Sequence, residues 1–111
     1  MVRPYKPHIP KDVSEIMDQL GFMMLASPTF VDKTGYFPSQ NIDTVFFQLN
    51  EGLRLIRGKL GEERYLKLKE MSDRMRTHFE ADPENKTDDT PKGCAIIHEM
   101  ELLLKQKIRK S

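Results

Sequence analysis

Residues 41–60, NIDTVFFQLNEGLRLIRGKL, carry the most regular apolar pattern of the chain. Apolar side chains recur there every three or four residues, at Ile42, Val45, Phe46, Leu49, Leu53, Ile56 and Leu60. This spacing places them on one face of an amphipathic helix. Asn41 is a suitable N-cap, and Asp43 in the first turn complements the helix dipole. We predict a single helix over 41–60, with Gly52 inside it allowing a neighbouring helix to approach closely.

The same spacing precedes this helix. Asp12 is a suitable N-cap, and Glu15 three residues later nearly completes a capping box. Apolar residues at helical spacing follow until Pro28, which disfavours helix in the residue before it. We predict a helix over 12–26. The residues before it carry a proline at every third position, which predicts an extended arm over 1–11: these are Pro4, Pro7 and Pro10.

Two further apolar stripes follow the central helix. The first predicts a helix over 62–80 that stops before Pro83. The second predicts a helix over 91–110, with Thr90 as its N-cap and Pro91 at its first position. Four helices without a credible strand pair predict an all-α fold. We expect an antiparallel four-helix bundle that forms a single domain over 12–111, with a long loop between its first two helices.

Composition excludes several classes of protein. The 111 residues suit one domain, and 18 basic against 17 acidic residues exclude a uniformly basic nucleic-acid coat. Cys94 is the only cysteine, so no intrachain disulfide can form. The N-terminus has no apolar run of the kind a signal peptide needs, and the longest apolar runs are far shorter than the ~20 residues that span a bilayer. We expect a cytoplasmic protein without a membrane segment.

Motifs for catalysis and metal binding are missing from the sequence. It contains no Gly-x-Ser-x-Gly, no phosphate-binding glycine loop, and no Glu-x-x-His of the kind that binds di-iron centres. Cys94 and His98 are four residues apart, but no second pair completes a zinc shell, and their role stays open. The segment after Asp82 departs from a calcium loop, since Lys86 and Gly93 occupy ligand positions. We expect no catalytic residue, cofactor or metal.

The uneven distribution of charge is the clearest functional signal. Residues 80–89 hold five acidic residues and one lysine, whereas 105–110 hold four basic residues and no acid. A solvated loop and a helix end that complements its dipole account for both clusters. Alternatively, the acidic segment binds a basic protein partner. The candidate residues are Glu80, Asp82, Glu84, Asp88 and Asp89. Nucleic-acid binding by the basic ends is disfavoured, because they lack interleaved aromatics and helix-turn-helix spacing.

Residues 27–40, SPTFVDKTGYFPSQ, are unusually apolar for a loop. Two interpretations are open. Phe30, Tyr36 and Phe37 either cover one end of the helices, or the segment protrudes as a recognition loop. In the second case Tyr36 and Phe37 are the apolar anchors of an interface.

Two parts of the chain resemble a class of known proteins. They are GYFPSQNIDTVFFQLNEGLRLIRGKLGEERY at 35–65, and DRMRTHFEADPENKTDD with GCAIIHEME between 73 and 101. In size and character they are similar to the compact immunity proteins that neutralise delivered bacterial toxins. The resemblance covers about residues 35–104. It implies a non-enzymatic inhibitor that masks the active site of a toxin, and a basic toxin domain would suit the acidic segment.

Two other functions stay open at this stage. One is a nucleic-acid-associated or regulatory helical protein that uses the basic termini. The other is the subunit of a structural homodimer, which would leave an apolar stripe uncovered in the monomer. The sequence does not distinguish a monomer from a dimer.

Overall fold

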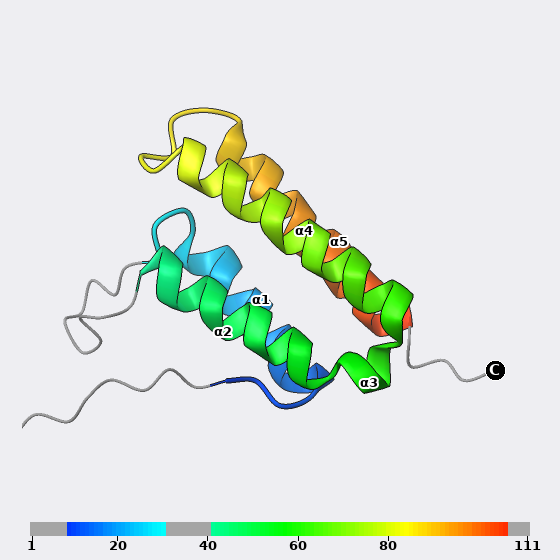
Figure 1. The fold of residues 1–111 in the computed structure, drawn as a ribbon. Helices are drawn as coiled ribbons and strands as arrows, with labels where there is room; N and C mark the ends of the chain where they lie inside the picture. Colours follow the sequence, from blue (N-terminus) through cyan, green and yellow to red (C-terminus); the bar gives the residue numbers. More distant parts are fainter. Residues whose placement is uncertain (1–8, 31–40, 107–111) are drawn as a thin grey trace, which may run out of the picture.

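The computed structural model describes residues 9–30 and 41–106, and these ranges form five helices and no strand (Figure 1). The helices are α1 (Val13–Ala26), α2 (Ile42–Leu55), α3 (Arg57–Leu60), α4 (Glu62–Ala81) and α5 (Asp89–Gln106). The predicted all-helical fold class is confirmed. Most of the predicted arm over 1–11 lies outside the described residues, as do residues 31–40 of the predicted loop.

The four longer helices run in alternating directions along the chain (Figure 1). α1 packs against α2 and α5, and α4 packs against the same two helices. The most extensive packing joins α4 to α5. Each long helix therefore buries its apolar stripe against two neighbours, which is how an amphipathic helix gains stability in a small domain.

Two predicted helix starts are confirmed. The Asp12 carboxylate accepts a hydrogen bond of 2.9 Å from the backbone N–H of Glu15, and the Asn41 side chain accepts one of 3.0 Å from Thr44. The Glu15 side chain accepts from the backbone N–H of Lys11. A full capping box would instead bond Glu15 to the cap residue itself.

The predicted single helix over 41–60 is wrong, because it is interrupted at Ile56. This residue has φ −99° and ψ 12°, which separates α2 from the one-turn helix α3. Gly61 then takes φ 86° and starts α4. Ile56 and Leu60 remain buried on either side of the turn. The apolar spacing consequently continues through the break and could not reveal it.

The predicted start of the last helix is also wrong. The helix begins at Asp89, so Thr90 and Pro91 lie in its first turn. Pro91 is tolerated there because the first N–H groups of a helix have no intrahelical acceptor. Thr90 is not the N-cap. Its own backbone N–H donates to the Asp82 carboxylate at 3.2 Å.

Three phenylalanines close one end of the core. Phe30 is fully buried, and its ring packs edge-to-face on Phe46 at 5.8 Å and on Phe79 at 5.3 Å between centroids. Its φ of 62° lies in the left-handed region, which is rare for a bulky residue. The expectation that Phe30 covers the helix ends is confirmed, while Tyr36 and Phe37 lie outside the described residues.

Two glycines allow helices to approach closely. A Cβ atom at Gly52 would lie 2.7 Å from Cδ1 of Ile16, which confirms the expected close contact of α2 with α1. A Cβ atom at Gly93 would lie 2.5 Å from Cε1 of Phe79. The α4–α5 contact therefore depends on a residue without a side chain at position 93.

We expect Gly93→Ala to destabilise the protein by about 1–3 kcal/mol, because the added Cβ would force the buried Phe79 ring out of its contacts with Phe30 and α5. Gly21→Ala is the matched control. An added Cβ at Gly21 meets nothing within 4 Å, and alanine in mid-helix adds roughly 0.5–1 kcal/mol. Urea unfolding of both variants measures the difference, and equal free energies of unfolding would contradict the assignment.

Candidate functional site

The acidic segment forms the connection between α4 and α5. We call residues 80–89 the acidic loop, which includes the last turn of α4 and the first residue of α5. It lies at the end of the helical hairpin in Figure 1, coloured yellow. The structure brings all five predicted acidic residues together on this loop, but it gives them two different environments.

Asp82 is an internal hydrogen-bond acceptor with only 2% of its surface exposed. Its carboxylate accepts from the backbone N–H of Lys86 at 2.7 Å, and from the N–H groups of Thr87 and Thr90 at 3.1 and 3.2 Å. The Thr90 hydroxyl donates a fourth bond of 2.8 Å. One carboxylate therefore organises the turn and the start of α5.

The pKa of Asp82 reflects two opposing effects. Burial alone would raise it, because a charged carboxylate is poorly solvated there. The hydrogen bonds from Lys86, Thr90 and Thr87 stabilise the ionised form more strongly, and they lower the pKa to about 2. Asp82 is thus ionised at neutral pH but directs its charge inward.

Asp89 is the second internally bonded acid. Its Oδ1 lies 2.8 Å from Nδ1 of His78, and its Oδ2 accepts from the Thr87 hydroxyl at 3.3 Å. The hydrogen bond with His78 lowers the pKa of Asp89, and the bond from Thr87 adds to this effect. His78 lies in the last turn of α4 and Asp89 begins α5, so the hydrogen bond joins the two helices, and the Asp89 carboxylate suits the N-terminal end of α5.

Glu80 belongs to a three-residue cluster that connects α4 to α2. Arg76 Nε donates to Glu80 at 2.8 Å, and a second nitrogen of the same guanidinium donates to Asp43. The hydrogen bond with Glu80 is the largest influence that raises the pKa of Arg76. The guanidinium also lies 5.6 Å from the centroid of the Phe46 ring. Two carboxylates thus share one cation at this surface.

The other two acidic residues face outward. Glu84 lies 3.1 Å from the exposed Lys86 amine. Asp88 is exposed, and its carboxylate has no partner within the described ranges. Glu80, Glu84 and Asp88 therefore expose their carboxylates, with Glu80 paired to Arg76 and Glu84 to Lys86, while the carboxylates of Asp82 and Asp89 hold the loop in shape. The predicted anchors Tyr36 and Phe37 are outside the described residues.

Cys94 and His98 have separate neighbours. The Cys94 Sγ lies 3.6 Å from Oγ of Ser27, and His98 Nδ1 lies 3.5 Å from a Glu101 oxygen. Within residues 9–30 and 41–106, no group of three or more histidine, cysteine, aspartate or glutamate side chains is placed to hold a metal ion.

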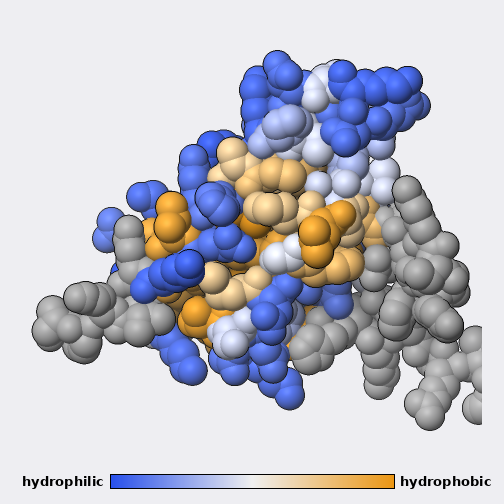
Figure 2. Space-filling model, turned by 180° about the vertical axis from the view of Figure 1, so that it is seen from behind, coloured by the Kyte–Doolittle hydropathy of each residue, from blue (hydrophilic) through white to orange (hydrophobic). Residues whose placement is uncertain are grey.

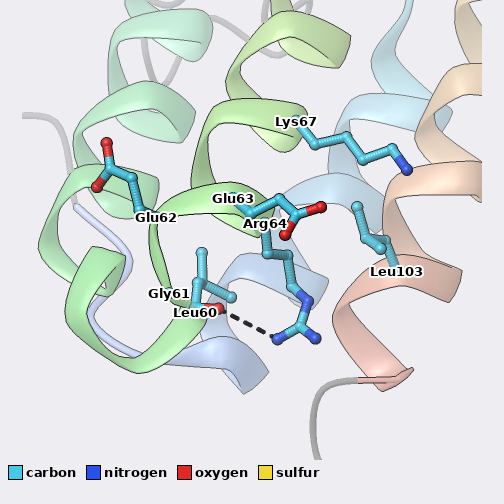
Figure 3. Close-up of a pocket in the computed structure, with 7 residues that line it drawn as sticks. All are labelled: Leu60, Gly61, Glu62, Glu63, Arg64, Lys67 and Leu103. Carbon is cyan, nitrogen blue, oxygen red and sulfur yellow. Dashed lines mark hydrogen bonds between the residues drawn. The ribbon is translucent and has the colours of Figure 1, made fainter.

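A polar hollow of about 410 Å³ opens where α3, α4 and α5 meet. Figure 3 shows Arg64 at its centre, with Lys67 and Leu103 on the α5 side and Glu62 directed away. Arg64 donates to the carbonyl of Leu60 at 3.2 Å, and Glu62 is bonded to Arg57 at 2.6 Å. The described side chains that line this hollow include no serine, threonine, cysteine or histidine and no pair of facing carboxylates.

A smaller pocket of about 340 Å³ adjoins the acidic loop. Sequence reasoning missed it, because its walls come from three segments that are distant along the chain. They are the end of α1, the start of α2 and the end of α4. Among the described residues, four of the seven that line it are apolar, and the seven are Pro28, Thr29, Asn41, Ile42, Phe79, Glu80 and Pro83. We call this the apolar pocket.

Comparison with known proteins identifies no family for the chain. No family model matches it, and neither a curated protein nor a solved structure is similar to it. In the part of the chain that the structure describes, no helix has the length and apolar character required to cross a bilayer.

We expect Asp82→Asn to lower the Tm at neutral pH, because an amide oxygen is a weaker acceptor than a carboxylate and the NH₂ group would face backbone N–H donors. The pKa of Asp82 is depressed from 3.8 to about 2 in the folded protein. The stabilisation by this carboxylate is therefore present above pH 3.8 and is lost as the pH falls toward 2. The Tm difference between wild type and variant should narrow over that interval.

Thermal unfolding followed by circular dichroism measures this effect. Glu84→Gln is the control, since it removes an exposed charge of the same loop whose ion pair with Lys86 is also exposed, and it should leave the Tm nearly unchanged. An equal response of the two variants would show that Asp82 has no special structural role.

Proposed function

We propose that this chain is a non-enzymatic protein-binding module of the immunity type, which blocks a bacterial toxin by binding it. Its scaffold is an antiparallel four-helix bundle, and the acidic loop is its binding surface. The partner is a basic protein domain, in keeping with the resemblance of residues 35–104 to compact immunity proteins.

The observation that carries this proposal is that the acidic loop contains two kinds of acidic residue, those bonded within the protein and those exposed to solvent. Asp82 and Asp89 bond to the loop itself, so the loop holds one shape before a partner arrives. Glu80, Glu84 and Asp88 then expose their carboxylates on a loop of defined shape that carries five acidic residues and one lysine. A preorganised surface loses less conformational entropy on binding, and complementary charge speeds the encounter with a basic partner.

A second candidate, the homodimer subunit, is supported by exposed apolar side chains. Figure 2 shows apolar residues gathered on the rear face of the molecule, the side on which α1 and α5 lie. On these helices Leu25 is 89% exposed and Leu102 is 56% exposed. Sedimentation equilibrium distinguishes this candidate. A homodimer would have twice the molecular mass of the chain, and Leu25→Gln would shift the apparent mass toward that of the monomer.

The test of the proposed function starts by identifying, from genomic context, each toxin domain encoded beside the gene for this chain. Co-expression should restore growth of cells that produce the toxin. We expect Glu84→Gln with Asp88→Asn to slow association about tenfold at low salt, with a smaller difference at high salt, because screening weakens long-range attraction. Stopped-flow or surface plasmon resonance measures the rate.

The matched control is Glu63→Gln with Glu99→Gln, which removes two exposed charges from the same hairpin away from the acidic loop. Failure of the chain to protect against any neighbouring toxin would contradict the proposed function. An association rate that responds equally to both double variants would contradict the role of the acidic loop.

A further inference from the structure

We infer that the apolar pocket receives one aliphatic side chain from a basic segment of the partner, with lysine or arginine next to that side chain. This inference rests on the proposed function and adds an apolar anchor to it. It assigns a task to the apolar residues that adjoin Glu80 and Pro83 at the start of the acidic loop.

The walls of the pocket are held by the fold itself. Phe79 is 1% exposed. Its ring packs on Phe30 on one side and lies close to α5 at Gly93 on another. Asn41 and Ile42 are held by the N-terminal cap of α2. A pocket with such walls exists before a ligand arrives, which is typical of ligand-binding sites.

The lining of the pocket selects the occupant. Apolar surfaces of Pro28, Ile42, Phe79 and Pro83 dominate it. Its volume of about 340 Å³ exceeds that of one aliphatic side chain and leaves room for the adjoining backbone of a peptide. An aliphatic side chain in a short peptide segment suits this lining better than a cofactor, which needs more polar contacts.

The charge at the rim selects the flanking residues. Glu80 lines the pocket and shares the Arg76 guanidinium with Asp43, so this cluster keeps a net negative charge. Pro83 leads directly to Glu84 on the acidic loop. An occupant with a cation beside its apolar side chain can therefore bury the side chain in the pocket and pair the cation with the acidic rim. A neutral or acidic segment can make only the first of these contacts.

Titration of the full chain with a short peptide tests this inference. Acetyl-Lys-Leu-Lys-amide should shift the amide resonances of Thr29, Ile42 and Glu80 in ¹H–¹⁵N spectra, with a Kd in the millimolar range. Acetyl-Lys-Gly-Lys-amide lacks the anchor, and acetyl-Glu-Leu-Glu-amide reverses the charge. We expect each to bind at least tenfold more weakly, because burial of an aliphatic side chain alone contributes about that factor.

Two pairs of variants complete the experiment. Thr29→Phe fills the pocket and should weaken binding of the leucine peptide at least tenfold, whereas Ser14→Phe on the exposed face of α1 should not. Glu80→Gln should weaken binding, whereas Glu70→Gln, which removes an equivalent i,i+4 pair with Arg74 on the same helix, should not. The dispersion of the amide spectrum verifies that each variant is folded.

Three results would overturn the inference. They are equal binding of the leucine and glycine peptides, equal binding of the basic and acidic peptides, and shifts absent from the pocket residues at about 10 mM peptide. Each of these leaves the proposed function standing if the chain still neutralises its toxin. Conversely, peptide binding without toxin neutralisation would preserve the pocket and reject the proposed function.

Discussion

The packing of Phe79 is the contact on which most of this structure depends. Its ring touches Phe30 from the end of α1, and it lies where a Cβ of Gly93 on α5 would otherwise be. The same ring forms part of the apolar pocket. Because protein interiors are close-packed, a change at this ring is transmitted to the hairpin, to the core and to the candidate binding site together.

The acidic loop shows that charge in the sequence and charge at the surface are different quantities. Five acidic residues occur in ten positions, but two of them form hydrogen bonds within the protein. Asp82 accepts from Thr90, and Asp89 is bonded to Thr87 and His78. The carboxylates exposed to solvent are the other three. The shape of the loop and its exposed acidic groups therefore depend on separate members of one cluster.

Periodicity predicted the all-helical fold and the capped starts at Asp12 and Asn41, because local spacing and local hydrogen bonds determine both. It could not predict the break at Ile56, since an apolar residue at that position is buried whether the helix continues or is interrupted there. The role of Asp82 was also out of reach, because a remote acceptor replaces the local N-cap expected at Thr90. The apolar pocket depends on tertiary contacts between three segments, and no local pattern records them.

The sharing of Arg76 between Glu80 and Asp43 has a consequence for any incoming cation. A guanidinium that is bonded to two carboxylates keeps one hydrogen-bonded carboxylate when the other turns toward an incoming cation. An approaching lysine could thus take Glu80 as its counter-ion while Asp43 continues to hold α2 to α4. Such an exchange would let the molecule engage a ligand without first loosening its own framework.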